Sequence, residues 1–310
     1  MSLIQCNNIT KRYGSTLALD DVSLSLEAGA PIALIGPNGA GKTTLFSLLC
    51  GFLRATSGDV KIMGYAPSDT KLHGRLAALP QDANLDPRFT VGHQLVLLAR
   101  LQGLSSSAAN KEARRVLDKV GLPEVIATKP EALSHGMRKR VMLAQALMGS
   151  PELILLDEPT AGLDPPNVKV MRSLIAEAAS NATFIISSHN LDELEKVCQS
   201  VVHLEKGKLK GIVDIAQSRS TDHNGYYTVV MADTSIEAHI IIASLKSLAS
   251  VSNVTFNTPN RFVVEYDAKQ AGLDTGLDIG IIKLLSDKGW TYRQLVNGRT
   301  LEDQLYFGSD

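Results

Sequence analysis

The 310-residue chain has few cysteines, few aromatic residues and almost no net charge. Its three cysteines, Cys6, Cys50 and Cys198, lie far apart, which excludes a dense disulfide framework and the close spacing of a metal site. We expect reduced thiols in a cytosolic protein, with two of them packed in its core. A net charge of −1 gives no global field that would attract nucleic acid or an anionic membrane, so no nucleic-acid partner is expected.

Long hydrophobic runs are missing as well. No apolar run approaches the ~20 residues that a membrane-spanning helix needs. The N-terminal residues also lack the basic and then apolar pattern of a secretory signal. The sequence therefore predicts a protein in the cytoplasm, and any role at a membrane would come through a partner. The length allows one large core and a second, smaller one.

A glycine-rich segment is the most informative motif that is present. It follows residues 31–35, an apolar run typical of a buried strand, and precedes residues 45–50, which are apolar at helical spacing. Its glycines let backbone N–H groups turn toward an anion, while a helix N-terminus and a lysine add positive charge. Strand, loop, Lys-Thr and helix predict a phosphate-binding loop, with Thr43 offering a hydroxyl to Mg²⁺. The loop residues are Gly36, Pro37, Asn38, Gly39, Ala40, Gly41, Lys42, Thr43 and Thr44.

Two further apolar segments end in polar side chains. Residues 153–156 run directly into Asp157 and Glu158, and residues 183–187 are followed by Ser188 and His189. The carboxyl ends of parallel strands face the ligand crevice, so we expect these side chains beside the phosphate loop. There Asp157 would hold Mg²⁺, and Glu158 would orient and deprotonate the water that attacks a γ-phosphate. His189 could bond a γ-phosphate oxygen, or it could be a structural histidine.

The segments around these motifs divide into strand and helix patterns. Residues 3–6 and 22–26 predict two strands around a turn near residues 13–15, and residues 58–62 and 75–79 predict two more. Residues 89–120 have helical periodicity and predict an all-helical insertion.

Three residues in these segments stand at notable positions. Tyr13 in the early turn could stack on an adenine, worth ~1 kcal/mol, or could be an ordinary surface tyrosine. Gln81 follows the strand pattern at 75–79. Ser134 is a suitable N-cap for a helix that runs to residue 148.

Together these motifs resemble the nucleotide-binding subunit of ATP-binding cassette (ABC) transporters over residues 3–213. In that resemblance Tyr13 is the adenine-stacking aromatic, Gln81 the Q-loop glutamine and His189 the switch histidine. Residues 36–44 match the Walker A loop, 133–137 the signature, 153–158 the Walker B strand, and 161–164 the D-loop that ends at Asp164.

The resemblance implies an α/β fold. It consists of a P-loop NTPase (RecA-like) core with an antiparallel β subdomain and an α-helical subdomain at about residues 85–145, all within residues 1–217.

The resemblance also implies a mechanism. Two cassettes, as a homodimer or a paired cassette, would enclose ATP, with Ser134, Gly136 and Asp164 of one subunit completing the site of the other. Lys42, Gln81, Glu158 and His189 would be catalytic, and Thr43, Gln81 and Asp157 would hold Mg²⁺. A separately encoded membrane permease would bind near residues 89–101, which would place the chain on the cytoplasmic face of the membrane.

The signature departs from the common LSGGQ form at two positions. His135 replaces the first glycine and Met137 replaces the glutamine, whereas Ser134 and Gly136 are retained. The two replacements affect residues that would contact the ribose. The variant is similar to the family branch that serves ABC-2-type exporters of drugs, lipids or polysaccharides.

The remaining residues predict a second domain. Residues 218–225 are polar and predict a linker, and residues 226–310 show a βαββαβ pattern typical of a small ferredoxin-like α+β domain. Residues 300–307 predict a final amphipathic helix capped by Thr300. No catalytic constellation is visible here; the domain could pack on the cassette or its dimer mate, or bind a regulatory small molecule or substrate.

Three other functions are alternatives to an exporter ATPase. A soluble ABC ATPase that acts on DNA or the ribosome usually has two cassettes or a long coiled-coil insertion, and this chain has neither. A binding module without hydrolysis is disfavoured by the intact Lys42, Asp157, Glu158 and His189. An import-type ABC ATPase stays open, because the motifs do not define the direction of transport.

Overall fold

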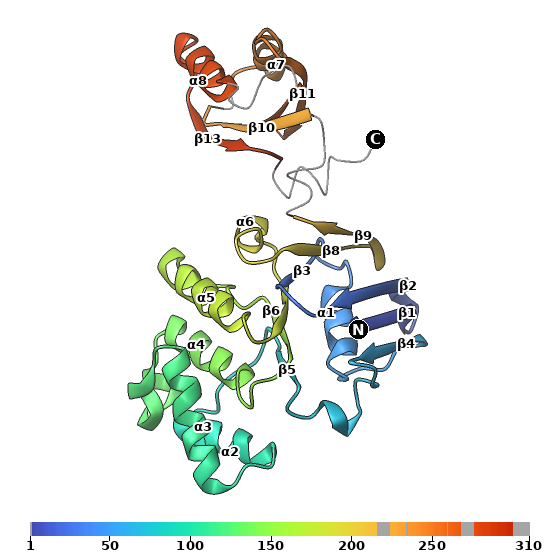
Figure 1. Ribbon diagram of the computed structural model, residues 1–310, viewed down its shortest axis with the longest axis vertical. Coiled ribbons are helices and arrows are strands. Elements are labelled where there is room, and N and C mark those ends of the chain that lie inside the picture. The colour runs from blue at the N-terminus through green and yellow to red at the C-terminus, as the bar shows by residue number, and fades with distance from the viewer. Residues whose placement is uncertain (1, 216–223, 234, 259, 268–275, 300–310) are drawn as a thin grey trace. The chain divides into compact units, whose positions relative to one another are not determined.

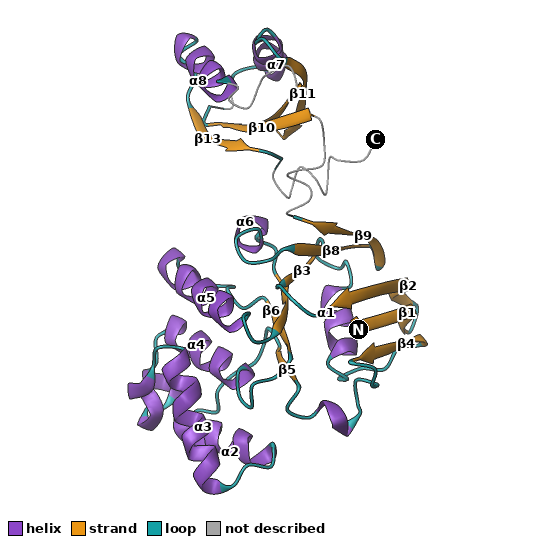
Figure 2. Cartoon of the chain, viewed as in Figure 1, coloured by secondary structure: helices purple, strands orange, loops and turns teal. Residues whose placement is uncertain are grey.

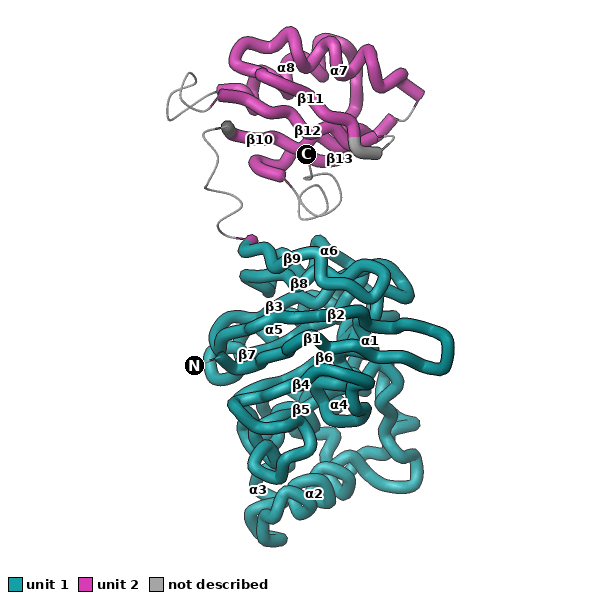
Figure 3. Tube along the Cα trace, turned by 90° about the vertical axis from the view of Figure 1, so that its right-hand side faces the viewer, with its two compact units in different colours: residues 1–214 teal, residues 215–310 magenta. Residues whose placement is uncertain are grey.

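The computed structural model describes residues 2–215, 224–233, 235–258, 260–267 and 276–299 (Figure 1). The chain forms two compact units, residues 1–214 (unit 1) and 215–310 (unit 2), each with its own core (Figure 3). No helix among the described residues has both the length and the apolar character needed to cross a membrane.

The central sheet of unit 1 has six strands. Strands β6 (Leu153–Asp157) and β7 (Thr183–Ser187) are buried at every residue, as expected for strands covered on both faces. The first five strands of the sheet run parallel, and β9 pairs antiparallel with β8 at the edge. In sheet order the strands are β5 (Leu76–Leu79), β6 (Leu153–Asp157), β7 (Thr183–Ser187), β3 (Ile32–Ile35), β8 (Ser200–Glu205) and β9 (Lys208–Asp214).

An antiparallel sheet of three strands forms the second layer of unit 1. Strand β1 (Ser2–Tyr13) lies between β2 (Thr16–Glu27) and β4 (Ser57–Ile62). In β2, alternating residues Val22, Leu24 and Leu26 are buried, the period-2 pattern of a half-buried strand. Helix α1 (Lys42–Leu49) packs between the two sheets, so its apolar side chains join both layers in one core (Figure 1).

The predicted helical insertion forms a subdomain of its own (Figure 2). The N-caps of its three main helices are Thr90, Ser105 and Ser134, and each side chain accepts a backbone N–H bond, worth about 1 kcal/mol. The elements are α2 (Val91–Leu101), α3 (Ser106–Lys119), two short 3₁₀ helices, η2 (Pro123–Ala127) and η3 (Pro130–Ala132), and α4 (His135–Ala146). A further 3₁₀ turn, η1 (Thr70–Leu72), precedes β5, and α5 (Pro165–Ala178) and α6 (Leu191–Leu194) follow β6 and β7.

Unit 2 has the predicted βαββαβ order. Its antiparallel sheet runs β11-β12-β10-β13, and helices α7 and α8 cover one face of it (Figure 1). Phe262, Ile241 and Ile281 are fully buried in the core between helices and sheet, and Trp290 packs against that core. The elements are β10 (Asn224–Met231), α7 (Ala238–Lys246), β11 (Val251–Thr258), β12 (Arg261–Asp267), α8 (Leu277–Asp287) and β13 (Tyr292–Asn297).

Some details differ from the expectations. Strands β8 and β9 and helix α6 were not predicted, because the short apolar run in β8 carries a histidine and β9 is half exposed. Asn224 and Gly225 belong to β10 and not to a linker. Residues 218–223 of that linker and the predicted helix at 300–307 lie outside the described residues.

Candidate active site

The phosphate loop connects β3 to α1 through backbone conformations that need glycine. Gly36 has a φ of 151°, and a Cβ there would lie 2.2 Å from the carbonyl oxygen of Leu204 in β8. Gly41, the N-cap of α1, has a φ of 102°, and a Cβ there would lie 2.7 Å from the carbonyl oxygen of Ala18. Both glycines let the loop approach neighbouring backbone, so its N–H groups can turn toward one point at the helix N-terminus.

The ammonium group of Lys42 lies inside this loop. It donates to the carbonyl oxygens of Gly36, at 2.6 Å, and Pro37, at 3.2 Å. These bonds hold the charge over the start of α1, where it adds to the partial positive charge of the helix. The loop is therefore built to bind a polyanion.

A cavity of about 350 Å³ opens beside the loop. It brings together loop residues, the predicted acids and the predicted Q-loop glutamine, which are far apart in the sequence. Its lining includes Asn38, Gly39, Ala40, Gly41, Lys42, Thr43, Thr44, Gln81, Asp157 and Glu158, together with Thr16, Leu17 and Ala18 of β2.

The acids stand at the carboxyl end of β6. Ser187, at the end of β7, donates its hydroxyl to Asp157, and the same Oγ accepts the backbone N–H of Glu158 at 3.0 Å. The Nδ1 atom of His189 lies 2.9 Å from Oε2 of Glu158. Because an ionised carboxylate only accepts, Nδ1 must carry the proton in this contact.

Burial and backbone conformation differ between the members of this pair. The Glu158 side chain is 12% exposed, whereas the His189 side chain is 73% exposed. Glu158 also has a φ of 50°, a left-handed conformation that costs a non-glycine residue about 1 kcal/mol. A mostly buried carboxylate that is paired with an exposed imidazole is suited to activating a water molecule.

One thiol lies near the acids, and its surroundings disfavour the reactive thiolate form. Burial, and then the negative charge of Asp157, raise the pKa of Cys50 to about 12. Cys50 is the C-cap of α1 and packs against the core of unit 1.

Seven predicted site residues do not line the cavity. Gly36 and Pro37 belong to the loop beside it and His189 contacts Glu158, whereas the other four lie on separate elements. Tyr13 ends β1 with 46% of its surface exposed, and the Lys11 ammonium lies 5.2 Å from its ring centroid. Ser134 caps α4, Gly136 is in its first turn, and Asp164 is the N-cap of α5. The structure thus brings residues of the predicted Walker A loop, Q-loop and Walker B strand together around one cavity. It places the residues of the predicted signature outside that cavity.

Two residues that the sequence did not single out organise the site. Ser187 ties both acids to β7. Asn167, on α5, donates to the carboxylate of Asp164 at 2.5 Å, and a Cβ at Gly136 would lie 2.3 Å from the Asn167 amide oxygen. Asn167 therefore joins the signature helix to the D-loop, and no local pattern marks such a contact.

Comparisons with known proteins agree with this geometry. A family model described as "ABC transporter" matches residues 19–161. The linearmycin resistance ATP-binding protein LnrL of Bacillus subtilis is 32% identical over 259 residues, which are 82% of this chain and 82% of that protein. The chain belongs to the ABC transporter ATP-binding proteins. It is therefore an ABC-type ATPase with the P-loop NTPase fold that its cavity indicates.

Other relatives of this ABC protein extend the comparison. The Nod factor export ATP-binding protein I of Burkholderia lata is 36% identical over 211 residues, 66% of this chain and 68% of that protein. A solved structure titled as the ATP binding subunit of an ABC transporter has a TM-score of 0.63 and 28% identity, and covers 70% of this chain and 92% of that one. A dimeric ATP-binding cassette in a post-hydrolysis state with ADP and Pi has a TM-score of 0.62 and 25% identity, covering 68% and 98%.

Proposed function

We propose that this ABC ATPase energises a separate membrane permease that exports its substrate. The observation that carries the proposal is the cavity in which Lys42, Gln81 and the acids at the end of β6 meet. Two relatives are named for linearmycin resistance and for Nod factor export, which supports outward transport. The proposal places the chain on the cytoplasmic face of the membrane through its partner.

The roles of the residues follow from their positions. Residues 36–44 hold the phosphates of ATP, with Lys42 moving its donor from the loop carbonyls to the anion, and Tyr13 stacks on the adenine. Thr43, Asp157 and Gln81 present hydroxyl, carboxylate and amide oxygens, the donor types that Mg²⁺ takes beside phosphate oxygens. Bound there, Mg²⁺ would neutralise charge on the phosphates.

Glu158 and His189 catalyse hydrolysis in this proposal. Glu158 accepts a proton from the attacking water, and the Nδ1–H of His189 keeps its carboxylate turned toward that water. The exposed Nε2 edge of His189 is then available to the γ-phosphate. Gln81, which lines the same cavity, senses the same phosphate.

The signature acts in trans in this proposal. Ser134, Gly136 and Asp164 lie outside the cavity of their own chain, so a second cassette must bring them to ATP. The N-terminus of α4, with the Ser134 hydroxyl, offers partial positive charge to the γ-phosphate. A homodimer satisfies this requirement twice.

A groove of about 780 Å³ is the proposed permease site. It runs between the end of α1, strand β5 and helices α2 and α4. Phe52 and Leu101 on its walls are 61% and 76% exposed, unusually high for large apolar side chains next to a deep groove. An amphipathic helix of the permease fits such a surface, and binding there would contact the elements that lead to Gln81.

Transport in inside-out membrane vesicles tests the proposal. Vesicles that contain the tagged chain and the membrane protein co-purified with it should accumulate an exported compound only with ATP and Mg²⁺. Lys42→Ala should abolish accumulation and ATP binding, and the exposed Lys169→Ala should leave both unchanged. A chain that never co-purifies with a membrane protein, or uptake that is insensitive to Lys42→Ala, would refute the export function.

A further inference from the structure

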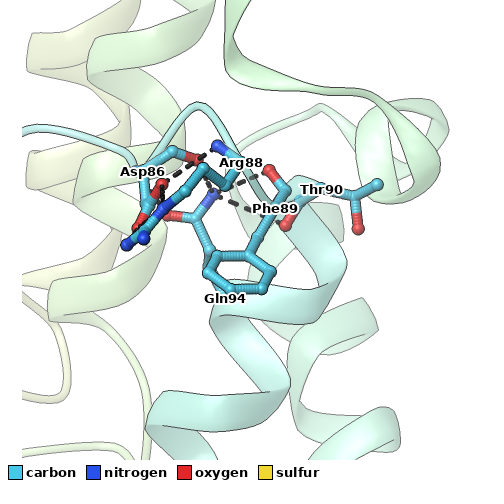
Figure 4. A network of polar contacts seen from close by, with 5 residues as sticks. All are labelled: Asp86, Arg88, Phe89, Thr90 and Gln94. Atoms are coloured by element: carbon cyan, nitrogen blue, oxygen red, sulfur yellow. Dashed lines mark hydrogen bonds and ion pairs between the residues drawn. The ribbon is translucent and has the colours of Figure 1, made fainter.

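A nine-residue loop connects Gln81, in the nucleotide cavity, to the first residue of α2. In the first turn of α2, Gln94 turns its side-chain amide back onto this loop (Figure 4). Its Oε1 accepts the backbone N–H of Asp86 at 2.8 Å, and its Nε2 donates to the carbonyl oxygens of Asp86, at 3.0 Å, and Phe89, at 3.1 Å. Gln94 thus bonds both backbone groups of Asp86, as a neighbouring strand would.

A layer of side chains supports the same turn (Figure 4). The Asp86 carboxylate accepts the backbone N–H of Arg88 at 2.9 Å and its guanidinium at 2.6 Å. The Arg88 guanidinium lies 5.6 Å from the Phe89 ring centroid, and that ring stacks on His93 at 5.2 Å. Because the Arg88 side chain is 78% exposed, this ion pair contributes little stability and mainly defines the geometry of the turn.

The first turn of α2 is itself fixed to the helical subdomain. Val91 and Leu95 are fully buried, and the Val91 N–H donates to the carbonyl oxygen of Thr128 at 2.9 Å. Residues 86–89 are therefore held to α2, and only residues 82–85 separate them from Gln81. Four residues span at most ~14 Å when extended, so the connection between Gln81 and this turn is short.

We propose that Gln94 is a positioning residue for ATP hydrolysis, which fixes the far end of the Gln81 loop to the helical subdomain. The inference rests on the proposed function, because it needs Gln81 to face the γ-phosphate. With the Gln94 bonds in place, a displacement of Gln81 moves α2 and the helices packed on it. One of these is α4, whose N-terminus carries Ser134, so occupancy of one site adjusts the signature offered to the other.

Gln94→Glu tests this role with almost no change in size. The substitution replaces the donating NH₂ by a carboxylate oxygen that would face the carbonyl oxygens of Asp86 and Phe89. At about pH 8 we expect kcat to fall roughly tenfold, with the KM for ATP within about twofold. Lower pH should restore activity relative to wild type, because the protonated carboxyl group regains a donor.

The other titratable groups at the turn are the same in the wild type and in Gln94→Glu. They are Asp86, Arg88 and His93, and all are present in both proteins. The Arg88 hydrogen bonds lower the pKa of Asp86 to about 2, so Asp86 stays ionised over the range measured. The ratio of the two kcat values at each pH therefore compares proteins that differ at this turn only in the introduced carboxyl group.

Two matched variants separate the possible results. Gln199→Glu, an exposed position with the same change of charge, should keep kcat at every pH. Gln81→Ala should lower kcat; if it does not, the proposed role of the loop fails. If Gln81→Ala lowers kcat while Gln94→Glu stays within about twofold of wild type, the Gln94 inference alone is overturned.

The pH response and a second substitution complete the test. A loss of activity in Gln94→Glu that does not recover at low pH would indicate a general structural defect and also overturn the inference. If this variant does not fold, Gln94→Ala takes its place, because water can then satisfy the loop groups. It should show the same loss of kcat with an unchanged KM and no pH-dependent recovery, and a wild-type kcat would contradict the role.

Discussion

The Nδ1 atom of His189 lies 2.9 Å from the Oε2 atom of Glu158, although 31 positions separate the residues in the chain. The contact joins the ends of two neighbouring parallel strands, β6 and β7. It pairs a mostly buried carboxylate with an exposed imidazole. In the proposed function, this pair activates the water that attacks ATP.

Glu158→Gln should therefore separate binding from hydrolysis. The glutamine side chain has the same size, and the backbone strain at positive φ is unchanged, but the amide cannot accept a proton. We expect turnover to fall by about 100-fold or more, with ATP affinity retained and a dimer visible by gel filtration in ATP. Glu177→Gln on the exposed face of α5 is the control, and wild-type turnover in Glu158→Gln would remove Glu158 as the base.

Gly136→Ala should disturb the signature through Asn167. The new methyl group would meet the Asn167 amide and displace it from Asp164, and overpacking of this kind costs about 1–3 kcal/mol. We expect kcat to drop about tenfold in steady-state ATPase assays.

A second substitution identifies the cause. Asn167→Ala makes room for the methyl group, so the double variant Gly136→Ala/Asn167→Ala should be more active than Gly136→Ala alone. Strict additivity of the two losses would show that the residues act separately. Gly280→Ala on α8, where a Cβ would meet its nearest neighbour at 4.0 Å, should be silent.

The helical subdomain should lose stability in acid when Glu112 is protonated. Hydrogen bonds from Arg115 lower the pKa of Glu112, although burial alone would raise it. The backbone N–H of Gly149, which donates to Glu112 at 2.7 Å, lowers this pKa further. A lowered folded-state pKa contributes stability above the unfolded value and loses it as pH falls through the folded value. At pH 7, Glu112→Gln should cost about 1 kcal/mol, discounted for partial exposure.

Thermal denaturation at several pH values measures this difference. The Tm of Glu112→Gln should lie about 2–4 °C below that of the wild type at neutral pH, and the gap should close in acid below the usual range of a glutamate pKa. The exposed Glu124→Gln should show no gap. A gap that persists unchanged in acid would mean that the carboxylate charge is not responsible.

Removal of residues 218–310 should leave a folded ATP-binding cassette. The core of unit 1 contains only residues of unit 1, and unit 2 has a separate core. Circular dichroism and equilibrium binding of ATP to the truncated chain measure this directly. An insoluble or non-binding product would place part of unit 2 in the cassette.

The sequence predicted what depends on neighbouring residues. The phosphate loop, the acids after residues 153–156 and the cap at Ser134 are local patterns, and the structure has the expected strand, loop and helix at each. The βαββαβ order of unit 2 also follows from local periodicity. Family resemblance supplied the names of these motifs, whereas their chemistry follows from the residues alone.

Contacts between distant elements could not be predicted in this way. Ser187 meets Glu158, and Asn167 meets Gly136, only because folding brings another segment against them. Gln94 reaches back eight residues to Asp86 only because the intervening loop turns. A serine at the end of a strand or a glutamine in a first turn has no distinctive pattern. Strand β8 was missed for a related reason, since its parallel pairing with β3, and not its own composition, defines it.

The position of Trp290 has a spectroscopic consequence. It is the single tryptophan of the chain and packs against the core of unit 2, with the Lys288 ammonium 5.8 Å from its ring centroid. Emission excited beyond the absorption of tyrosine therefore reports the melting of unit 2 alone. A nucleotide that binds and stabilises unit 1 will raise the temperature of its calorimetric transition. Any accompanying shift in the temperature of the tryptophan transition would measure the energetic coupling between the two units, without a label on the protein.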